Sequence, residues 1–300
     1  MAEELAGKLA KTKFKVLADD VKKVKFDVDG TKLTITLTAP ASHIGDIIKV
    51  AEVARDLPPK MEKISWCHLS QDQKMVYATV LNQSRARIQD LVKQKGFNRC
   101  RMEVLTALMR LRQICCHLDL LKLPELHPAV PSAKTDLFFE LVDEAIDSGH
   151  RLLVFSQFVT MLGILRDQLD RQGIRYCYLD GSTKERMKVV HEFNSDREVP
   201  LFLISLKAGG VGLNLTGADM VIHFDPWWNP AAEDQATDRA HRIGQKRTVY
   251  SIKLITRDTI EEKVLALQER KRRVIAATIE SDENVMQQLT WEDVQELLEM

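Results

Sequence analysis

The stretch LFLISLKAGGVGLNLTGADMVIHF, residues 201–224, decides the fold that we expect. Its two ends are short runs of apolar side chains, and a glycine-rich segment separates them. Runs of the same kind occur at residues 152–155, 175–179 and 249–254, with amphipathic helical patterns between them. Such alternation is typical of a parallel sheet with right-handed crossovers and helices on both faces. The sequence therefore predicts an α/β fold whose ligands gather at the carboxyl ends of the strands.

Four glycines follow the first of these runs within nine residues: Gly209, Gly210, Gly212 and Gly217. Each glycine costs conformational entropy on folding, so glycine is used where the backbone must approach something closely. One of the four could serve a plain tight turn, but four together favour a binding loop. Lys207, at the mouth of this loop, is either a solvated side chain or a phosphate contact.

A helix is expected after the second run, in the segment that ends with EDQATDRAHRIGQ, residues 233–245. Asn229 suits the N-cap and Pro230 the first helical position, while Gly244 is a typical residue just beyond the end. These signals predict roughly four turns at about 3.6 residues each. Small and apolar residues form one face, which we expect to pack against the sheet: Ala232, Ala236, Ala240 and Ile243.

The other face of this helix carries Gln235, Asp238, Arg239 and Arg242 at helical spacing. A solvated surface of ion pairs, each contributing a few tenths of a kcal/mol, is one interpretation. An anion site is the other, because arginine forks match phosphate oxygens and an arginine can stabilise charge during phosphoryl transfer.

Polar residues also follow the other runs. Ser156 and Gln157 end the run at 152–155, and Ser205 ends the run at 201–205. Ser182 and Thr183 follow the run at 175–179, and Ser182 with Glu185 has the spacing of a capping box that opens the next helix. Helix N-termini suit phosphates, although most caps serve only their own helix. Trp227 and Trp228 either pack beneath the arginine helix or rest on a nucleic-acid backbone.

The composition describes an ordinary globular chain of 300 residues, with 45% hydrophobic and 29% charged residues. Lys+Arg and Asp+Glu both number 43, so net charge argues neither for nor against a nucleic-acid partner. The five cysteines show no zinc-type spacing, and we expect no metal site. We find no signal peptide and no apolar run of the ~20 residues that a membrane span needs. An intracellular protein without a membrane partner is therefore expected.

Four segments are expected along the chain. Residues 1–56 form a small α+β element, with a hairpin that turns at Asp29-Gly30 and a short helix from about residue 42 to 56. Residues 57–132 form a helical insertion, which breaks near Gly96 and ends in a proline-rich linker. Residues 133–257 hold the parallel sheet, and residues 258–300 form a charged helical tail.

The quoted motifs together resemble one family. RLLVFSQF (151–158), YLDGSTKERMKVVHEFN (178–194), residues 201–245 and DTIEEKVLALQERKR (258–272) resemble the C-terminal RecA-like lobe of SWI/SNF-type, superfamily 2 helicase-like ATPases. LPPKMEKISWCHLSQDQKMVY (57–77) and LMRLRQICCH (108–117) resemble the segment that links the two lobes in that family. The resemblance runs from about Glu52 to the C-terminus, and it implies a RecA-like fold with a brace helix at 258–272.

Family members couple ATP hydrolysis to translocation along double-stranded DNA without separating the strands. The resemblance implies that Arg242 is an arginine finger, that Arg239 contacts the ATP phosphates, and that Gln235 belongs to the same catalytic motif. It also implies an ATP-binding set and a set that contacts the DNA backbone without reading its sequence. The first set is Gly210, Gly212, Asn214 and Asp238; the second is Ser156, Gln157, Ser182, Thr183, Ser205, Lys207 and Trp228.

Two parts of the family's active site have no counterpart in the sequence. ATP hydrolysis needs a G-x-x-x-x-G-K-[ST] loop and an acidic box for magnesium. AGKLAKTK (6–13) lacks the first glycine at the proper spacing, and DEAIDSGH (143–150) lies in an amphipathic helical pattern. We therefore expect ATP with Mg²⁺ to be held mainly by a first RecA-like lobe, in cis or in trans, and this chain to be inactive alone.

We expect the second motor lobe of a DNA-dependent ATPase, present either as a fragment or as a separately encoded lobe. The location would be the cytoplasm or nucleoid of a bacterium, or the nucleus of a eukaryote. A non-catalytic DNA-binding or scaffold module that keeps the lobe fold is the alternative. A dinucleotide-binding domain does not fit, because the glycine loop follows a late strand and no acidic residue follows at the required ~20-residue distance.

Overall fold

The computed structural model describes residues 57–122, 132–208, 212–275 and 289–298, together with two short strands at 25–29 and 32–36. Only the backbone is described for these two strands and for residues 271–275. The chain divides into two compact units, Met1–Leu57 and Pro58–Met300. Each unit is described by itself.

The first unit contains an antiparallel hairpin. Strand β1 (Lys25–Asp29) pairs with β2 (Lys32–Thr36), which confirms the predicted hairpin. Asp29 was expected in the turn, but it pairs with Lys32 and therefore belongs to strand β1. The helix expected at 42–56 lies outside the described residues.

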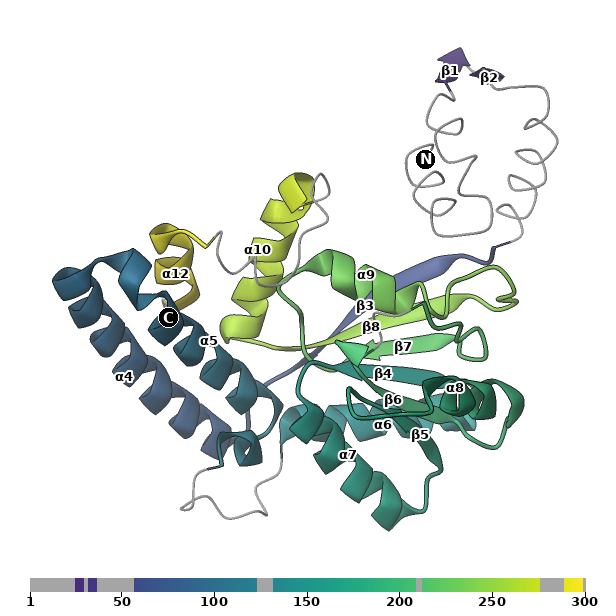
Figure 1. Cartoon of the computed structure of the whole chain (residues 1–300), viewed down its shortest axis with the longest axis horizontal. Coiled ribbons are helices and arrows are strands. Elements are labelled where there is room, and N and C mark those ends of the chain that lie inside the picture. Colours follow the sequence, from purple (N-terminus) through teal and green to yellow (C-terminus); the bar gives the residue numbers. More distant parts are fainter. Residues whose placement is uncertain are drawn as a thin grey trace. The chain divides into compact units, whose positions relative to one another are not determined.

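A six-stranded parallel sheet forms the centre of the second unit, in the order β3-β8-β7-β4-β6-β5 (Figure 1). Two of the predicted runs, at 152–155 and 201–205, are buried at every residue, which explains why they are apolar throughout. These two and the three other predicted runs are all confirmed as strands. Their bounds are Leu152–Ser156 (β4), Tyr176–Leu179 (β5), Leu201–Ser205 (β6), Met220–His223 (β7) and Val249–Thr256 (β8).

Strand β3 (Lys60–Cys67) was not predicted, and it lies within the region 57–132 that was expected to form a helical linker or insertion. It forms one edge of the sheet and pairs with β8 along its whole length, from Lys60 beside Val249 to Cys67 beside Thr256. Most of its side chains are exposed, including Met61. An edge strand of this kind lacks the apolar run that marks a buried strand.

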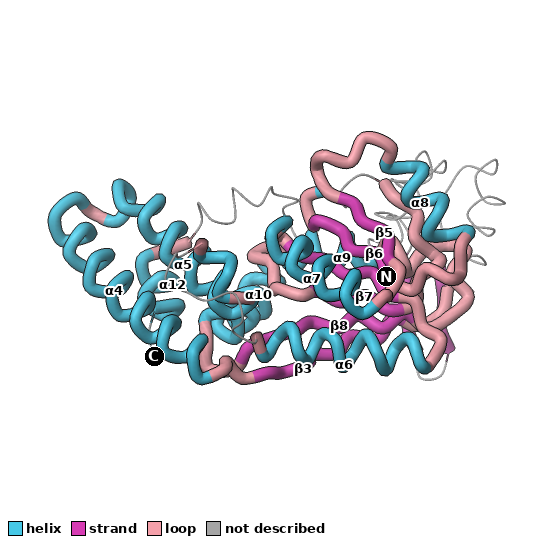
Figure 2. The backbone as a smooth tube through the Cα atoms, turned by 90° about the horizontal axis from the view of Figure 1, so that it is seen from below, coloured by secondary structure: helices cyan, strands magenta, loops and turns pink. Residues whose placement is uncertain are grey.

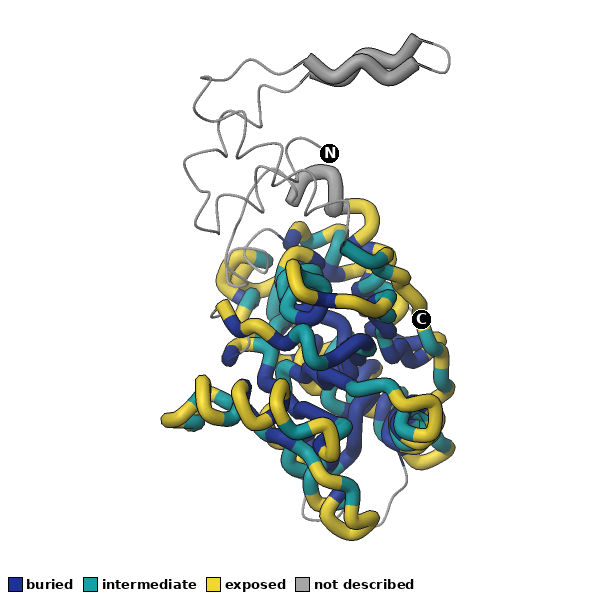
Figure 3. The backbone as a smooth tube through the Cα atoms, turned by 90° about the vertical axis from the view of Figure 1, so that its right-hand side faces the viewer, coloured by how far each residue is buried: buried dark blue, intermediate teal, exposed yellow. Residues whose placement is uncertain are grey.

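Helices cover both faces of the sheet, as predicted. One face packs against α6 (Ala133–Asp147) and α7 (Val159–Gln172), and the other against α8 (Arg186–Ser195) and α9 (Pro230–Thr237). Alternate side chains of one strand serve the two layers: in β4, Leu152 and Val154 join the first cluster, and Leu153 and Phe155 join the second. Buried residues fill the interior, with exposed residues around it (Figure 3).

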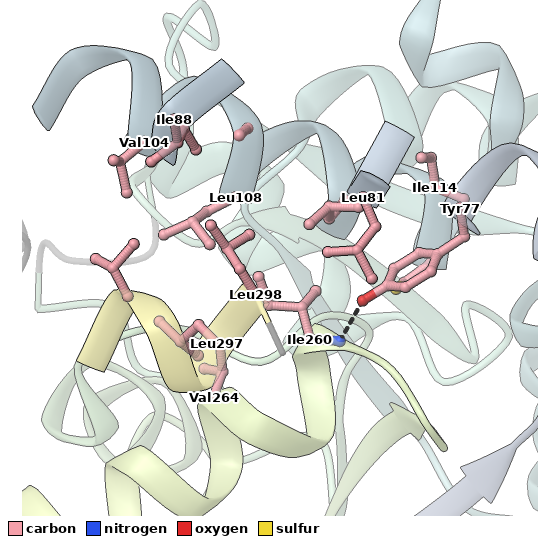
Figure 4. Close-up of a cluster of buried hydrophobic side chains, with 14 of the residues drawn as sticks. Tyr77, Leu81, Ile88, Val104, Leu108, Ile114, Ile260, Val264, Leu297 and Leu298 are labelled. Carbon is pink, nitrogen blue, oxygen red and sulfur yellow. Dashed lines mark hydrogen bonds between the residues drawn. The ribbon is translucent and has the colours of Figure 1, made fainter. Parts of the chain in front are cut away.

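A helical layer stands at one end of the sheet (Figure 2). Gly96, with a φ of 77°, ends α4 and confirms the predicted break in the helical pattern. Buried leucine, isoleucine and valine side chains join four helices in one cluster, and the Tyr77 hydroxyl accepts a hydrogen bond of 2.7 Å from the Ile260 amide (Figure 4). The four helices are α4 (Gln71–Lys95), α5 (Arg101–Cys116), α10 (Ile260–Ile275) and α12 (Trp291–Leu298), and two 3₁₀ turns, Phe97–Cys100 and Leu118–Leu121, flank α5.

Candidate nucleotide and DNA site

The arginine segment, residues 229–245, begins as predicted and ends its helix early. The Asn229 side chain accepts a hydrogen bond of 2.9 Å from the Ala231 amide, and Pro230 occupies the first helical position. However, α9 ends at Thr237, and turns carry the chain to Gly244, whose φ is +104°. The prediction of four turns is therefore wrong, because α9 is shorter, with eight residues.

Contacts from residues outside α9 accompany this early end. The Arg239 carbonyl accepts from the Leu215 amide at 3.0 Å, and the Ala240 carbonyl accepts from the Gln245 side chain at 3.1 Å. Two carbonyls that a longer helix would use internally are thus bound from outside it. Buried Ala240 packs on the sheet as predicted, but Ile243 is 57% exposed and does not.

The four polar residues of this segment do not share one helical face. Gln235 lies in α9, Asp238 caps its end, and Arg239 and Arg242 lie in the following turns, all of them partly exposed. Burial lowers the pKa of Arg239, and the charge of Arg242 lowers it further, whereas Asp238 raises it. The two guanidinium groups therefore repel each other, and an anion between or beside them would relieve that repulsion.

The glycine loop lies directly against this segment. Gly209 and Gly210 are outside the described residues, whereas Gly212 is exposed and has a φ of +46°. A Cβ added at Gly217 would lie 2.8 Å from the Asn194 side-chain oxygen, so close backbone approach requires glycine there. Asn194 also donates to the carbonyl of Asn214 at 2.8 Å and accepts from the Gly217 amide at 3.1 Å.

Gln245, which the sequence patterns did not single out, joins the loop to the arginine segment. Its buried side-chain amide donates to the carbonyls of Ala218 and Ala240, at 2.7 and 3.1 Å. Its side-chain oxygen accepts from the backbone amides of Lys246 and Arg247 at 2.8 and 2.9 Å. The only sequence signal was its place at the end of the quoted stretch 233–245.

Three of the predicted DNA contacts are buried. Ser156 donates its hydroxyl to buried Asp225, Ser205 lies inside the sheet, and Trp228 packs beneath the guanidinium of Arg112 at 5.3 Å. These residues are 1%, 3% and 7% exposed, so little of each is presented to a phosphate. Their burial argues against direct side-chain contact with DNA.

The remaining predicted DNA contacts are Gln157, Ser182, Thr183 and Lys207. Ser182 and Lys207 are exposed, whereas Gln157 and Thr183 are partly buried. Strands β5 and β6 are neighbours, with Leu179 beside Ile204, so the residues that follow them lie at the same edge of the sheet. Parallel strands present their carboxyl ends together, which brings the turn after β5 and the loop after β6 to one edge.

The predicted capping box at Ser182 is wrong. Helix α8 begins at Arg186, and Glu185 precedes it without a side-chain cap. The Ser182 amide and hydroxyl instead both donate to Asp180 Oδ1, at 2.8 and 2.6 Å. The Ser182 hydroxyl thus donates to a local carboxylate, whereas in a capping box it would accept from the amide of Glu185.

Arg112, a second residue that sequence reasoning missed, fastens the helical layer to two strand ends. It is 2% exposed, donates to the Gln157 side-chain oxygen at 3.1 Å and to the Pro226 carbonyl, and lies 3.7 Å from Asp225. Burial raises the pKa of Asp225, and the charge of Arg112 opposes that rise. From the sequence alone, an arginine in a helical pattern is expected at the surface. Its burial depends on partners that lie far away in the sequence.

Comparison with known proteins agrees with this arrangement. Residues 133–244 match the model of the helicase conserved C-terminal domain, and residues 48–120 match the SNF2-related domain. The Sulfolobus solfataricus SWI2/SNF2 ATPase C-terminal domain has 32% identity and a TM-score of 0.62, covering 79% of this chain and 97% of that one. Its ATPase core in complex with dsDNA has 31% identity and a TM-score of 0.66, covering 82% and 52%.

Among curated proteins, an uncharacterized ATP-dependent helicase of Mycoplasma pneumoniae is 36% identical over 83% of this chain and 24% of its own length. The putative ATP-dependent helicase/translocase YwqA of Bacillus subtilis is 38% identical over 82% and 27%. The fold and these matches thus define the C-terminal RecA-like lobe of a helicase-type ATPase. The chain belongs to the SWI/SNF family of these proteins, and it spans about a quarter of the length of those two relatives.

In the parts of the chain that the structure describes, no group of three His, Cys, Asp or Glu side chains is placed to hold a metal ion. No helix among those residues has the length and apolar content of a membrane span.

Proposed function

We propose that the chain is the second motor lobe of an ATP-dependent, double-stranded DNA translocase or remodelling ATPase. The observation that carries the proposal is the contact between the glycine loop and the arginine segment, where the Leu215 amide binds the Arg239 carbonyl. This contact sets a loop suited to close approach beside a pair of guanidinium groups. Such a site presents positive charge to a polyphosphate.

Arg242 acts as the arginine finger in this proposal. Its charge stabilises the negative charge that develops on the phosphate oxygens as the terminal phosphoryl group passes to water. Arg239, half-buried and with its pKa lowered by burial and by Arg242, gains most from a bound anion and holds the ATP phosphates. Gln235 and Asp238 complete the motif.

The ATP-binding set consists of these residues and the glycine loop. Gly212 and Asn214 are exposed at the surface of the loop, and Gly210 belongs to the same proposal although it lies outside the described residues. Mg²⁺ bound with the ATP would supply neutralisation of the phosphate charge. We place its ligands, together with the phosphate-cradling loop, on a first RecA-like lobe supplied in cis or in trans.

The DNA-facing part of the proposal rests on Gln157, Ser182, Thr183 and Lys207. They gather at the carboxyl edge of the sheet, and the exposed ammonium group of Lys207 can neutralise a phosphate charge. Contacts of this kind position a protein on duplex DNA without reading its sequence. The same proposal assigns the protein an intracellular location, where such DNA is found.

ATP turnover tests the proposal. The chain is assayed with duplex DNA, first alone and then mixed with a first lobe encoded by the same genome. We expect no turnover from the chain alone and DNA-stimulated turnover from the mixture, because the two lobes contribute different halves of the site. If neither assay shows ATP turnover and the chain still binds duplex DNA, the motor role is contradicted. The chain would then be a DNA-binding or scaffold module.

A salt titration tests the DNA contacts separately. Affinity for duplex DNA should fall linearly with salt on logarithmic axes, with a slope of about −0.9 for each phosphate neutralised. A flat response between low and physiological salt would remove the DNA-facing assignments. This measurement needs no first lobe.

A further inference from the structure

The turn after strand β5, residues 180–183, is organised around one carboxylate. Asp180 Oδ1 accepts from the Ser182 amide at 2.8 Å, from the Ser182 hydroxyl at 2.6 Å and from the Thr183 hydroxyl at 3.3 Å. Asp180 Oδ2 accepts from the Tyr178 hydroxyl at 2.8 Å. The Asp180 amide in turn donates to Thr183 Oγ1 at 3.0 Å.

This carboxylate is ionised at neutral pH. Hydrogen bonds, above all that from the Ser182 hydroxyl, lower the pKa of Asp180 to about 2. Tyr178 stays a donor, because burial and its bond to Asp180 raise its pKa to about 12. The guanidinium of Arg166 lies over the Tyr178 ring at 4.4 Å and supports it from α7.

Two physical effects of Asp180 on DNA binding have opposite signs. A negative charge at an edge that meets phosphates repels them, so its removal by charge alone would strengthen binding. A carboxylate that fixes the turn reduces the conformational freedom that binding must otherwise remove, so its removal would weaken binding. The number of hydrogen bonds from the turn to Asp180 favours the second effect.

We propose that Asp180 is a positioning residue that holds Ser182 and Thr183 in the arrangement in which this turn meets the DNA backbone. Asp180 does not touch the DNA itself. The inference rests on the DNA-binding part of the proposed function and adds to it a residue whose acidic side chain would otherwise argue against a role at a phosphate-binding surface.

Three variants of the full chain separate the two effects. Asp180→Ala removes the charge and the acceptors. Asp180→Asn removes the charge but keeps one acceptor oxygen for Ser182 and Thr183. Tyr178→Phe keeps the charge and removes one donor to it. Asp167→Ala, which removes an exposed carboxylate of α7, is the matched control for charge.

The readout is the dissociation constant for duplex DNA at fixed, low salt, with the melting temperature measured in parallel. We expect Asp180→Ala to bind about fivefold more weakly, which corresponds to the ~1 kcal/mol of a typical hydrogen bond. Asp180→Asn should bind at least as tightly as the wild type, and Tyr178→Phe slightly more weakly. Asp167→Ala should bind equally well or slightly more tightly.

The failures of the two proposals are distinguishable. If the wild-type chain binds duplex DNA and Asp180→Ala binds equally or more tightly, the positioning role is overturned and the proposed function stands. If the wild-type chain does not bind, the DNA part of the proposed function fails and the inference fails with it. Should Asp180→Ala not fold, Tyr178→Phe decides, because unchanged affinity in that variant contradicts positioning.

Discussion

The amide of Leu215 donates a hydrogen bond of 3.0 Å to the carbonyl of Arg239, across 24 positions of sequence. This bond joins the glycine loop to the arginine segment at the residue where α9 has already ended. The backbone at Arg239 is therefore held at both ends: its carbonyl accepts from the loop, and its amide donates to the carbonyl of Ala236 in α9 at 3.2 Å. The loop and the segment that carries the two arginines are thus connected through the backbone of Arg239.

Arg242→Ala should abolish ATP hydrolysis in the reconstituted two-lobe protein and leave DNA affinity nearly unchanged. Loss of an arginine finger lowers kcat by about 10³-fold or more, because the finger acts on charge in the transition state. Steady-state turnover and DNA binding are measured on the same preparation. Arg87→Ala, at an exposed position of α4, is the control. A large loss of DNA affinity would show that Arg242 faces DNA and not ATP.

Gln245→Glu should lower turnover of the reconstituted protein by more than it lowers DNA affinity. The replacement has the same shape, but it loses the donations to Ala218 and Ala240 and sets a negative charge against their carbonyls. The loop and the arginine segment then lose their shared anchor. We expect kcat to fall at least tenfold with KM for DNA within about twofold, following the ~1–3 kcal/mol cost of unsatisfied buried groups. Equal losses in both parameters would indicate general unfolding instead.

Arg112→Ala should destabilise the second unit by about 3–5 kcal/mol, because Asp225 would keep a buried and unpaired carboxylate. Denaturant unfolding measures the loss. Adding Asp225→Asn to this variant should recover part of the stability, since a neutral amide costs less to bury than a charge. If the two substitutions are additive, the ion pair contributes nothing, and Arg112 acts through its hydrogen bonds to Gln157 and Pro226 and its packing on Trp228.

His223 should make the second unit lose stability as pH falls. Burial, with a smaller contribution from Lys253, lowers its pKa from 6.5 to about 3. Below pH 6.5 the unfolded chain binds a proton that the folded chain does not, so stability is full above 6.5 and falls toward 3, by at most about 1.4 kcal/mol per pH unit.

The test for His223 compares unfolding free energies at pH 7.5 and 5 for the wild type and for His223→Asn, which does not titrate. The variant should be less stable at pH 7.5, because the contact of His223 with Thr237 at 3.0 Å is altered, but it should lose less on acidification. Identical pH dependence in the two proteins would exclude His223 as the cause.

The local sequence pattern was sufficient to predict five of the six strands and insufficient to predict β3. Strands β4 and β6 lie between other strands and are buried at every residue, so each is an apolar run, and β5, at the other edge of the sheet, still alternates buried with partly buried residues. Strand β3 has solvent along one side and exposes Met61, Ile64 and Trp66, at 54%, 37% and 36%. Residues 60–67 form a strand because they pair with β8, and the neighbouring sequence gives no sign of that pairing.

The sequence predicted which residues belong to the candidate site better than it predicted how they are arranged. Asn229 and Pro230 mark the start of α9 because capping is local, whereas the end of α9 depends on Leu215 and Gln245, which lie outside the helix. The spacing of Ser182 and Glu185 predicts a cap, but the carboxylate of Asp180, two positions before Ser182, accepts from the Ser182 amide and hydroxyl instead. Burial of Ser156 likewise depends on Asp225, 69 positions away.

Strands β3 and β8, which pair in the sheet, are synthesised at widely separated times. Cys67 and Thr256, partners at the end of the pairing, are 189 positions apart. A ribosome that adds about 5–20 residues per second needs about 10–40 s to reach the second partner after the first. During synthesis, β3 is the first strand of this sheet to be made, and its backbone hydrogen bonds to β8 can form only after the last strand has followed.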